Sequence, residues 1–524
     1  MRKCIKDACD GRKNNFDFIR FVAASMVIYS HAFPLTRGNA GELLNDISNG
    51  AWSFGSLAVA VFFIISGFLI SQSYCKKNSP IFFVEARVLR IFPGLIVVIL
   101  LSVFVLGPIY TTIPLSEYFK SSITWTYLKS IFLYPIYWNL PGVFENNFFS
   151  PSVNGSLWTI PFEVFFYGVV LFLGVLGILR EKKISLLGFL CFSILSAFQV
   201  QIFPVDGHFL SFSLYSMIEL GLYFFAGMTF FAYRDVIVLD RHYAMMSLSF
   251  LMICILLGSY AIPFSIFGGY LIMYIAFSEK VKLNSFSKHG DFSYGIYIYG
   301  FPVQQAVTAS FGGAMNPYLN MAISYPVTML FAALSWFLIE SPCIKQKKWK
   351  SPEQWTLWLC HFQERIRKIL AVNWIKYVAI CCAIGAMLYM NYSVPSYIEM
   401  PSNKQGIFLS GWLEQSDSED YRWVSMESSL KLKQKSTSEI FVVEGFIPES
   451  FDEVTFVQVY FDDVLMGEYS FSSGDALSIN IPVEKGEGDK TVVVKLAFNA
   501  EHIPTDDSGD ARVMSALITK IGFC

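Results

Sequence analysis

The chain has 524 residues; 54% of them are hydrophobic, only 15% are charged, and the formal net charge is −2. Soluble proteins carry nearer to about 25% charged residues, so this composition excludes an ordinary soluble enzyme and predicts a protein with many membrane-spanning helices. No basic domain stands out, which argues against nucleic-acid binding. The ten cysteines show no metal-binding spacing, so no metal is expected.

Eleven stretches are candidates for transmembrane helices, since a spanning helix needs about 20 mostly apolar residues. They are residues 16–35, 54–74, 88–110, 157–179, 184–203, 211–232, 244–261, 263–279, 292–311, 318–339 and 373–392. Lys and Arg concentrate in the loops that a cytoplasmic N-terminus would leave on the cytoplasmic side, where such residues are enriched. An odd number of spans then places the C-terminus in the periplasm or outside the cell.

The first span, FDFIRFVAASMVIYSH, carries polar groups that an ordinary membrane helix does not need. Each charged group in hydrocarbon costs about 2.5–3.5 kcal/mol even on the lenient insertion scale. Asp17 is three residues before Arg20 and can pair with it. Arg20 and His31 are eleven positions apart, close to three whole turns, so they share one face and differ in depth by roughly 16 Å. This face is predicted to line a polar route through most of the membrane.

Two arginines, Arg87 and Arg90, fall at the predicted cytoplasmic end of the third span, in EARVLRIFPG. Two interpretations remain open for them. Basic residues anchor helix ends on the cytoplasmic side, and arginine forks also match the oxygens of a phosphate group.

The fourth span, NGSLWTIPFEVFFYGVV, contains a carboxylate about two turns from its start. Asn154 and Ser156 can cap this helix, and Thr159 and Tyr167 share a face with Glu163. A buried ion pair that orients helices is the structural alternative. Because such a pair gains little stability over apolar packing, a functional role explains these intramembrane charges better.

The amino-acid composition and hydrophobic pattern of the chain change after the tenth span. Residues 343–372 are basic and amphipathic, which predicts a helix lying on the inner leaflet, and 373–392 is the eleventh span. Residues 397–524 contain β-rich runs such as IFVVEGFI and KTVVVKLAF, separated by Gly, Asp, Ser and Pro, which is typical of a small extracytoplasmic β-sandwich.

An ordered set of motifs over about residues 14–342 resembles the membrane acyltransferase family 3. The motifs are Arg20-x10-His31, FFIISGFLI, Arg87-x2-Arg90 followed by Pro93, SLWTIPFE, SYGIYIYGFP and FLIESP. The resemblance implies an integral-membrane O-acyltransferase, often an acetyltransferase, that modifies surface polysaccharide or lipopolysaccharide. The membrane domain of this family would occupy residues 1–342.

The resemblance also implies roles for individual residues. The catalytic histidine would be His31, with Arg20 as its partner arginine and Glu163 as the intramembrane acid. Asp17 joins this catalytic group because its spacing lets it pair with Arg20. Apart from the resemblance, we expect acetyl-CoA to contact Arg20, Ser66, Arg87 and Arg90. We expect the acceptor to contact Asn154, Trp158, Tyr167 and Tyr297. No role carries over to Ala60, where many relatives have Asp, or to Gly300, where many have His.

The β-rich region resembles carbohydrate-binding-like modules attached to some glycan enzymes. A structural role and sugar binding are both open for it. The residues of interest there are Trp412, Arg422, Trp423, Asp510 and Arg512.

The expected reaction moves an acetyl group from cytoplasmic acetyl-CoA to a sugar hydroxyl of an extracytoplasmic glycan, such as O-antigen, capsule or exopolysaccharide. His31 would act as general base, and Glu163 would orient it or balance its charge. The expected partners are the bilayer of the bacterial inner membrane and a lipid-linked or finished polysaccharide. A secondary transporter or flippase and a lipid-linked glycan polymerase are the alternatives, although no inverted repeat and no arginine-rich outer loop is evident.

Overall fold

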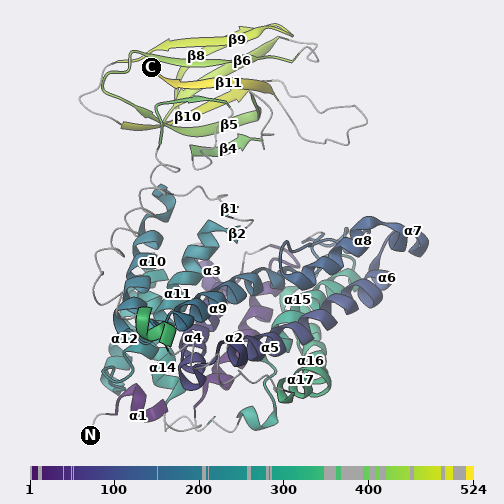
Figure 1. Ribbon diagram of the computed structural model, residues 1–524. Helices are drawn as coiled ribbons and strands as arrows, with labels where there is room; N and C mark the ends of the chain where they lie inside the picture. Colours follow the sequence, from purple (N-terminus) through teal and green to yellow (C-terminus); the bar gives the residue numbers. More distant parts are fainter. Residues whose placement is uncertain are drawn as a thin grey trace. The chain divides into compact units, whose positions relative to one another are not determined.

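The computed structural model (Figure 1) describes about four fifths of the chain. The described residues are 3–9, 14–38, 41–48, 50, 52–149, 151–202, 208–209, 212–256, 261–278, 283, 286–346, 361–366, 394–400, 407–413, 421–448, 454–484, 490–499 and 515–524. The chain divides into two compact units, one of residues 1–197 with 217–372 and the other of residues 198–216 with 373–524.

Helices make up the first unit. In chain order the helices are α1 (Ile5–Cys9), α2 (Phe16–Ala32), α3 (Leu43–Ile47), α4 (Phe54–Lys77), α5 (Pro80–Leu101), α6 (Gly107–Tyr110), α7 (Leu115–Lys120), α8 (Ser122–Tyr127), α9 (Ile160–Val175), α10 (Lys182–Ile202), α11 (Leu214–Ala232), α12 (Arg241–Leu256), α13 (Ala261–Pro263), α14 (Gly269–Ala276), α15 (Ser293–Ser310), α16 (Pro317–Ser335) and α17 (Ser341–Lys345). Short 3-10 or π-helical turns extend several of them: η1 (Ser102–Leu106), η2 (Leu128–Phe132), η3 (Gly155–Thr159), η4 (Phe264–Gly268), η5 (Phe286–His289) and η6 (Trp336–Glu340).

Ten of the eleven predicted spans coincide with helices, and the eleventh, 373–392, lies outside the described residues. Within the described part of the chain, five helical stretches are long and apolar enough to cross a membrane: Phe54–Lys77, Pro80–Tyr110, Gly155–Val175, Leu214–Ala232 and Pro317–Lys345. The chain therefore has the helices of a membrane protein, while the count of eleven spans is not confirmed. The helix of the first predicted span, α2, has only 17 residues.

The third span begins earlier than predicted. Ser79 caps α5 by accepting a hydrogen bond from the amide of Phe82 at 3.3 Å, and Pro80 occupies the first turn, where proline is well tolerated. The helix therefore starts eight residues before position 88. Arg87 and Arg90 lie two to three turns inside it, which corrects their predicted position at its end.

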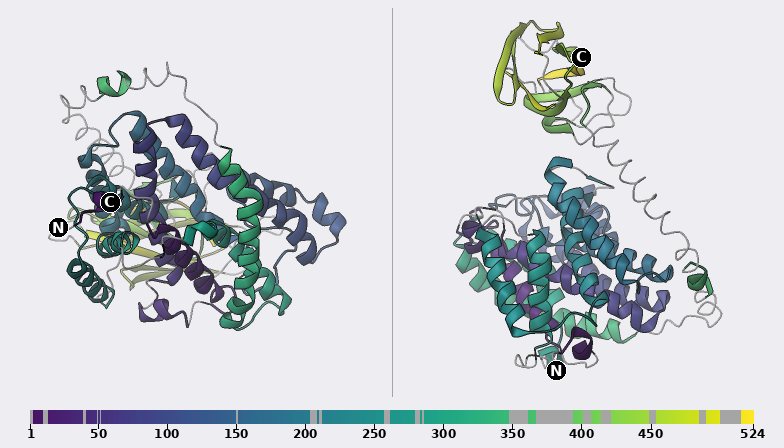
Figure 2. Two further views of the ribbon diagram at one scale, coloured as in Figure 1. Left: turned by 90° about the horizontal axis from the view of Figure 1, so that it is seen from below. Right: turned by 90° about the vertical axis from the view of Figure 1, so that its left-hand side faces the viewer.

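Helix α2 occupies the centre of the first unit. It packs against α4, α15 and α16, and small or branched residues fill the contact: Ala24 and Ile28 of α2 meet Ile296 of α15 and Ala332 of α16. Figure 2 shows these helices from two further directions. Helix α2, which carries the predicted polar face, thus has helices packed on several of its sides. Its polar groups therefore lie among other helices.

Antiparallel strands make up the C-terminal domain. They are β3 (Tyr397–Glu399), β4 (Phe408–Trp412), β5 (Arg422–Gln434), β6 (Ile440–Phe446), β7 (Thr455–Phe461), β8 (Val464–Phe471), β9 (Ala476–Pro482), β10 (Lys490–Phe498) and β11 (Ala516–Phe523). Earlier in the chain, β1 (His208–Phe209) and β2 (Phe212–Ser213) pair with each other. The nine strands form one sheet in the order β8-β7-β10-β5-β11-β6-β9, with β3 beside β11 and β4 beside β5.

Alternation of buried and exposed residues builds the core of this sheet. In β9, for example, Leu477, Ile479 and Ile481 are buried and the residues between them are exposed, as expected for a strand with one face against a core. The sheet curls until β8 and β9, at the two ends of the order, approach each other. The all-β prediction is confirmed, and the architecture is closer to a barrel than to two separate sheets.

The side chains singled out for sugar binding take part in packing where they are described. Trp412 packs against the core and lies 4.8 Å from the ring of Phe408. The guanidinium of Arg422 lies 4.0 Å from the same ring and donates from Nε to the carbonyl of Leu413 at 2.7 Å. Trp423 contacts Tyr421 edge-on. Asp510 and Arg512 lie outside the described residues.

Candidate active site

A cavity between the helices of the first unit collects most of the predicted site residues. Its empty volume, including the part open to solvent, is about 910 Å³. Side chains from α2, α4, α5, η3, α9 and α15 line it, with apolar residues such as Val59, Phe62, Phe63 and Ile160 over much of the surface. Its polar lining consists of Arg20, Ser66, Arg87, Arg90, Thr159, Glu163, Tyr167, Ser293, Tyr294 and Tyr297.

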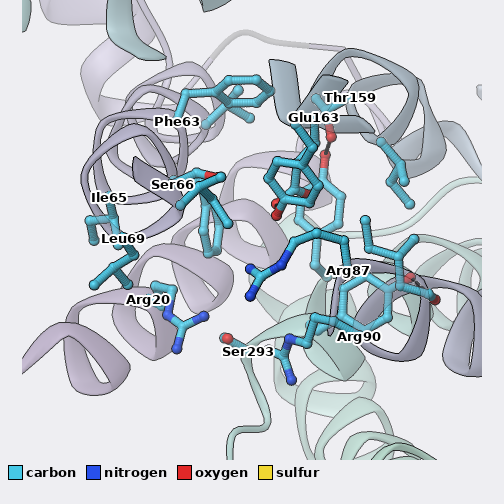
Figure 3. A pocket seen from close by; sticks show the side chains of 18 residues that line it. Arg20, Phe63, Ile65, Ser66, Leu69, Arg87, Arg90, Thr159, Glu163 and Ser293 are labelled. Atoms are coloured by element: carbon cyan, nitrogen blue, oxygen red, sulfur yellow. Dashed lines mark hydrogen bonds between the residues drawn. The ribbon is translucent and has the colours of Figure 1, made fainter. Parts of the chain in front are cut away.

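Three arginines from two helices face this cavity. Figure 3 shows Arg20 of α2 and Arg87 and Arg90 of α5 directed toward the same space, with Ser293 between two of them. The sequence-based prediction placed all three at an acyl donor. Their convergence in one cavity, from segments about 70 residues apart, gives the site a strong capacity to bind anions.

Two of the arginines share one carboxylate. Oδ2 of Asp291 lies 3.0 Å from Nη2 of Arg20 and 2.7 Å from Nη2 of Arg90. Arg20 also pairs with Asp17, as the spacing of these residues predicted. Oδ1 of Asp291 accepts a hydrogen bond from Ser293 Oγ at 2.6 Å, so both oxygens of this carboxylate are occupied.

Arg90 has further partners around its guanidinium. A carboxylate oxygen of Glu340 lies 3.6 Å from Nη1, and the rings of Tyr294 and Trp336 lie 5.7 and 5.8 Å from the guanidinium carbon. Such contacts hold an arginine in one position, since its flat group stacks on aromatic faces. Arg90 is therefore fixed by four groups besides any ligand.

Arg87 differs from the other two arginines. It lies over the rings of Phe83 and Tyr167, at 5.7 and 5.6 Å, and within the described residues it has no carboxylate partner. Its Nε atom is buried and lacks a hydrogen-bond partner there. The residue is half-buried, and an anionic ligand would supply the counter-charge that the described residues do not place in contact with its guanidinium.

Helix α9 supplies an acid and a phenol to the same cavity. Tyr167 Oη donates a hydrogen bond to Glu163 Oε1 one turn away. Thr159, at the end of η3, shares a hydrogen bond of 2.6 Å with the hydroxyl of Tyr297 on α15. The predicted acceptor contacts Tyr167 and Tyr297 thus line the same cavity as the predicted donor contacts.

His31 lies outside the lining of this cavity. It is near the end of α2, with its ring edge-on to Phe301 at 5.4 Å between centroids, and its side chain forms no hydrogen bond or ion pair with the described residues. Phe301 is one helical turn beyond Tyr297 on α15. The imidazole is therefore about one turn from the cavity, and Glu163, which bonds to Tyr167, does not contact it as the orienting partner that we predicted.

Two other predicted acceptor contacts have structural roles here. Asn154 donates from Nδ2 to the carbonyl of Ile298 at 2.9 Å and caps η3 through the amide of Ser156 at 3.2 Å. Trp158 is partly exposed and packs against Phe162. Neither residue lines the cavity.

Sequence reasoning missed Asp291 and Glu340. Both could have been named as candidates from the sequence, because Asp291 immediately precedes the predicted ninth span and Glu340 is the acid of FLIESP. Charged residues at membrane depth mark functional or paired positions. Their partners were not predictable from the sequence. Arg90 and Arg20 lie 201 and 271 residues from Asp291, and Arg90 lies 250 residues from Glu340. No cluster of potential metal ligands occurs among the described residues.

Comparison with known proteins identifies the family. Residues 13–340 match the family described as "Acyltransferase domain" (Acyl_transf_3), and the chain belongs to it. A protein of Shigella phage Sf6 named "O-acetyl transferase" is 30% identical over 340 residues, which cover 63% of this chain and 95% of that protein. "Nodulation protein 10" of Rhizobium leguminosarum bv. viciae is 29% identical over 360 residues, covering 64% and 94%.

Part of the chain is similar to one solved structure. A family 35 carbohydrate-binding module from an environmental isolate covers 24% of this chain and 91% of its own length, with 12% identity and a TM-score of 0.17. The family match and the named relative establish the class of activity: the chain is an acyltransferase.

Proposed function

We propose that the chain transfers an acetyl group from cytoplasmic acetyl-CoA to a sugar hydroxyl of an extracytoplasmic glycan in the bacterial inner membrane. The observation that carries this proposal is the cavity with three arginines and a largely apolar remainder. The relative named "O-acetyl transferase" supports oxygen as the acceptor atom and acetyl as the group. A transporter or polymerase is disfavoured because the family is one of acyltransferases.

The arginines supply the donor end of the proposed site. Arg20, Arg87 and Arg90 lie in the first halves of α2 and α5, which both begin in the cytoplasm if the N-terminus is inside, as the distribution of basic residues predicts. Phosphate groups of acetyl-CoA would meet these arginines. The uncharged pantetheine arm would follow the apolar lining formed by Phe62, Phe63 and Ile160.

His31 supplies the proposed chemistry at the other end. Its imidazole takes the proton of the sugar hydroxyl, the sugar oxygen bonds to the thioester carbonyl carbon, and the carbon–sulfur bond breaks. The proton then passes from the imidazolium to the departing thiolate, so the products are an acetyl ester and free CoA. Because His31 is outside the cavity lining and packs against Phe301, the acetyl group has to leave the cavity on the His31 side to react there.

Labelled acetyl transfer tests this proposal directly. The purified protein in lipid vesicles is given labelled acetyl-CoA and a bacterial glycan fraction, and label in the glycan is measured. We expect the rate of acetyl transfer by H31A to be at least about 100-fold lower than that of the wild type, because removal of a general base typically lowers the rate by about 10²–10⁴-fold.

A histidine substitution elsewhere is the matched control. His242 is exposed at the start of α12, and H242A is expected to retain the wild-type rate. Acetyl transfer by H31A at the wild-type rate would refute the catalytic assignment, and no thioester consumption by the wild type would refute the donor.

A further inference from the structure

Asp291 is a charged residue of the site region that does not itself line the cavity. It stands in the segment just before α15, and its side chain is only 13% exposed. Its Oδ2 atom contacts Nη2 of Arg20 and Nη2 of Arg90 at 3.0 and 2.7 Å, so these two nitrogens are at most about 5.7 Å apart. Two positive groups at this spacing repel each other unless a negative charge lies between them.

We propose that Asp291 is a positioning residue that holds Arg20 and Arg90 together as one anion-binding unit. The inference rests on the proposed donor-binding role of the cavity and deepens it. Asp291 acts through the arginines: it sets their spacing and cancels part of their charge. The donor then meets aligned N–H groups of Arg20 and Arg90, while the full positive charge resides on Arg87.

The surroundings of Asp291 fit a fixed carboxylate. Ser293 donates to Oδ1 at 2.6 Å, which leaves Oδ2 to face the two arginines. The hydroxyl of Tyr294 donates to the carbonyl of Ile91 at 2.7 Å and thereby ties the start of α15 to α5. The carboxylate is therefore anchored to the helix that carries Arg90, and it joins α2 to that helix through Arg20.

The charges around the three arginines are divided unequally. Asp17, Asp291 and Glu340 all lie against Arg20 or Arg90. None of these acids contacts Arg87 in the described part of the chain. This division predicts different consequences for the loss of each arginine, and it predicts that the effect of losing Asp291 depends on whether Arg90 is present.

A double-mutant cycle on Asp291 and Arg90 tests the proposal. The wild type, D291N, R90Q and the double variant are compared by kcat/KM for acetyl-CoA. Each single variant is expected to lose about tenfold or more, because one partner of a buried charge pair is left unmatched. The double variant should be less impaired than the product of the single effects, since coupled groups are not additive.

Further variants separate positioning from mere stabilisation of the fold. D291E, which keeps the charge, should retain more kcat/KM than D291N. D235N is the matched control, because Asp235 pairs with Lys182 at 2.6 Å on the exposed surface, and it should leave kcat/KM unchanged. Single-variant effects that multiply in the double variant, or D291E no better than D291N, would overturn the proposal.

The same proteins separate a failure of this proposal from a failure of the proposed donor. If the wild type consumes no acetyl-CoA, the donor assignment fails. Inorganic pyrophosphate then serves as the probe, because it tests the arginines without any acyl group. The same non-additive pattern in its Kd would support Asp291 as the positioning residue, and independent effects on Kd would contradict it.

Discussion

Individual side chains of the cavity differ in how their charge is balanced. Arg20 and Arg90 contact carboxylates within hydrogen-bonding distance, whereas Arg87 contacts the faces of Phe83 and Tyr167. Arginines at membrane depth are usually paired or functional, and Arg87 has no carboxylate in contact with it among the described residues. Arg87 is accordingly the residue on which affinity for an anionic donor should depend most.

Replacement of Arg87 tests this directly. R87Q is expected to raise KM for acetyl-CoA by about tenfold or more with a smaller change in kcat, because a hydrogen bond to a charged group contributes about 1.5–3 kcal/mol. Steady-state kinetics with varied acetyl-CoA give both constants. Arg241, exposed at the start of α12, provides the control R241Q, and equal effects of the two substitutions would argue against a donor contact at Arg87.

Pairs of helices are fixed by close approach of their backbones. A Cβ atom added to Gly67 of α4 would lie 2.0 Å from the carbonyl oxygen of Phe224 of α11, and one added to Gly227 would lie 2.0 Å from that of Ile64. The contact is reciprocal, so each helix needs its glycine where the two cross. Small residues permit this approach between membrane helices, and α4 in turn carries Ser66 and much of the apolar lining of the cavity.

Substitution at this crossing should cost stability. G67A must push α4 and α11 apart, and overpacking of a close contact typically costs about 1–3 kcal/mol. We expect purified G67A in detergent to unfold at a lower temperature than the wild type, with unfolding measured by fluorescence. A Cβ atom added to Gly168 of α9 would meet no atom within 4 Å, so G168A should leave that temperature nearly unchanged; a similar drop for both variants would contradict the argument.

The whole chain joins a helical unit and a C-terminal β domain. The family match ends at residue 340, so the chemistry belongs to the helical unit. The β domain has its own core of buried side chains, which includes Phe441 and Phe523; the partly buried ring of Phe461 contacts both of these rings. A domain with its own core can be removed without taking core residues from the helices.

Removal of residues 397–524 tests a role for the β domain in presenting the glycan. If the domain aligns a polymeric acceptor, the truncated protein should acetylate short glycan fragments at about the wild-type rate and long polysaccharide much more slowly. Labelled acetyl transfer to size-fractionated glycan measures both. Unchanged transfer to long chains would count against alignment and favour a structural role for the domain.

Membrane character, the positions of ten helices, the all-β C-terminal domain and the family were all predictable from the amino-acid sequence. They follow from the amino-acid composition, the spacing of hydrophobic residues along the chain and short motifs, all of which are properties of local sequence. The pairing of Asp17 with Arg20 was also predictable, because its partners are one turn apart. Three relations required the folded chain: Asp291 lies between Arg20 and Arg90, Tyr167 and Tyr297 share a cavity with the arginines, and His31 lies apart from that cavity. These relations join residues from distant helices, so the packing of helix on helix decides them.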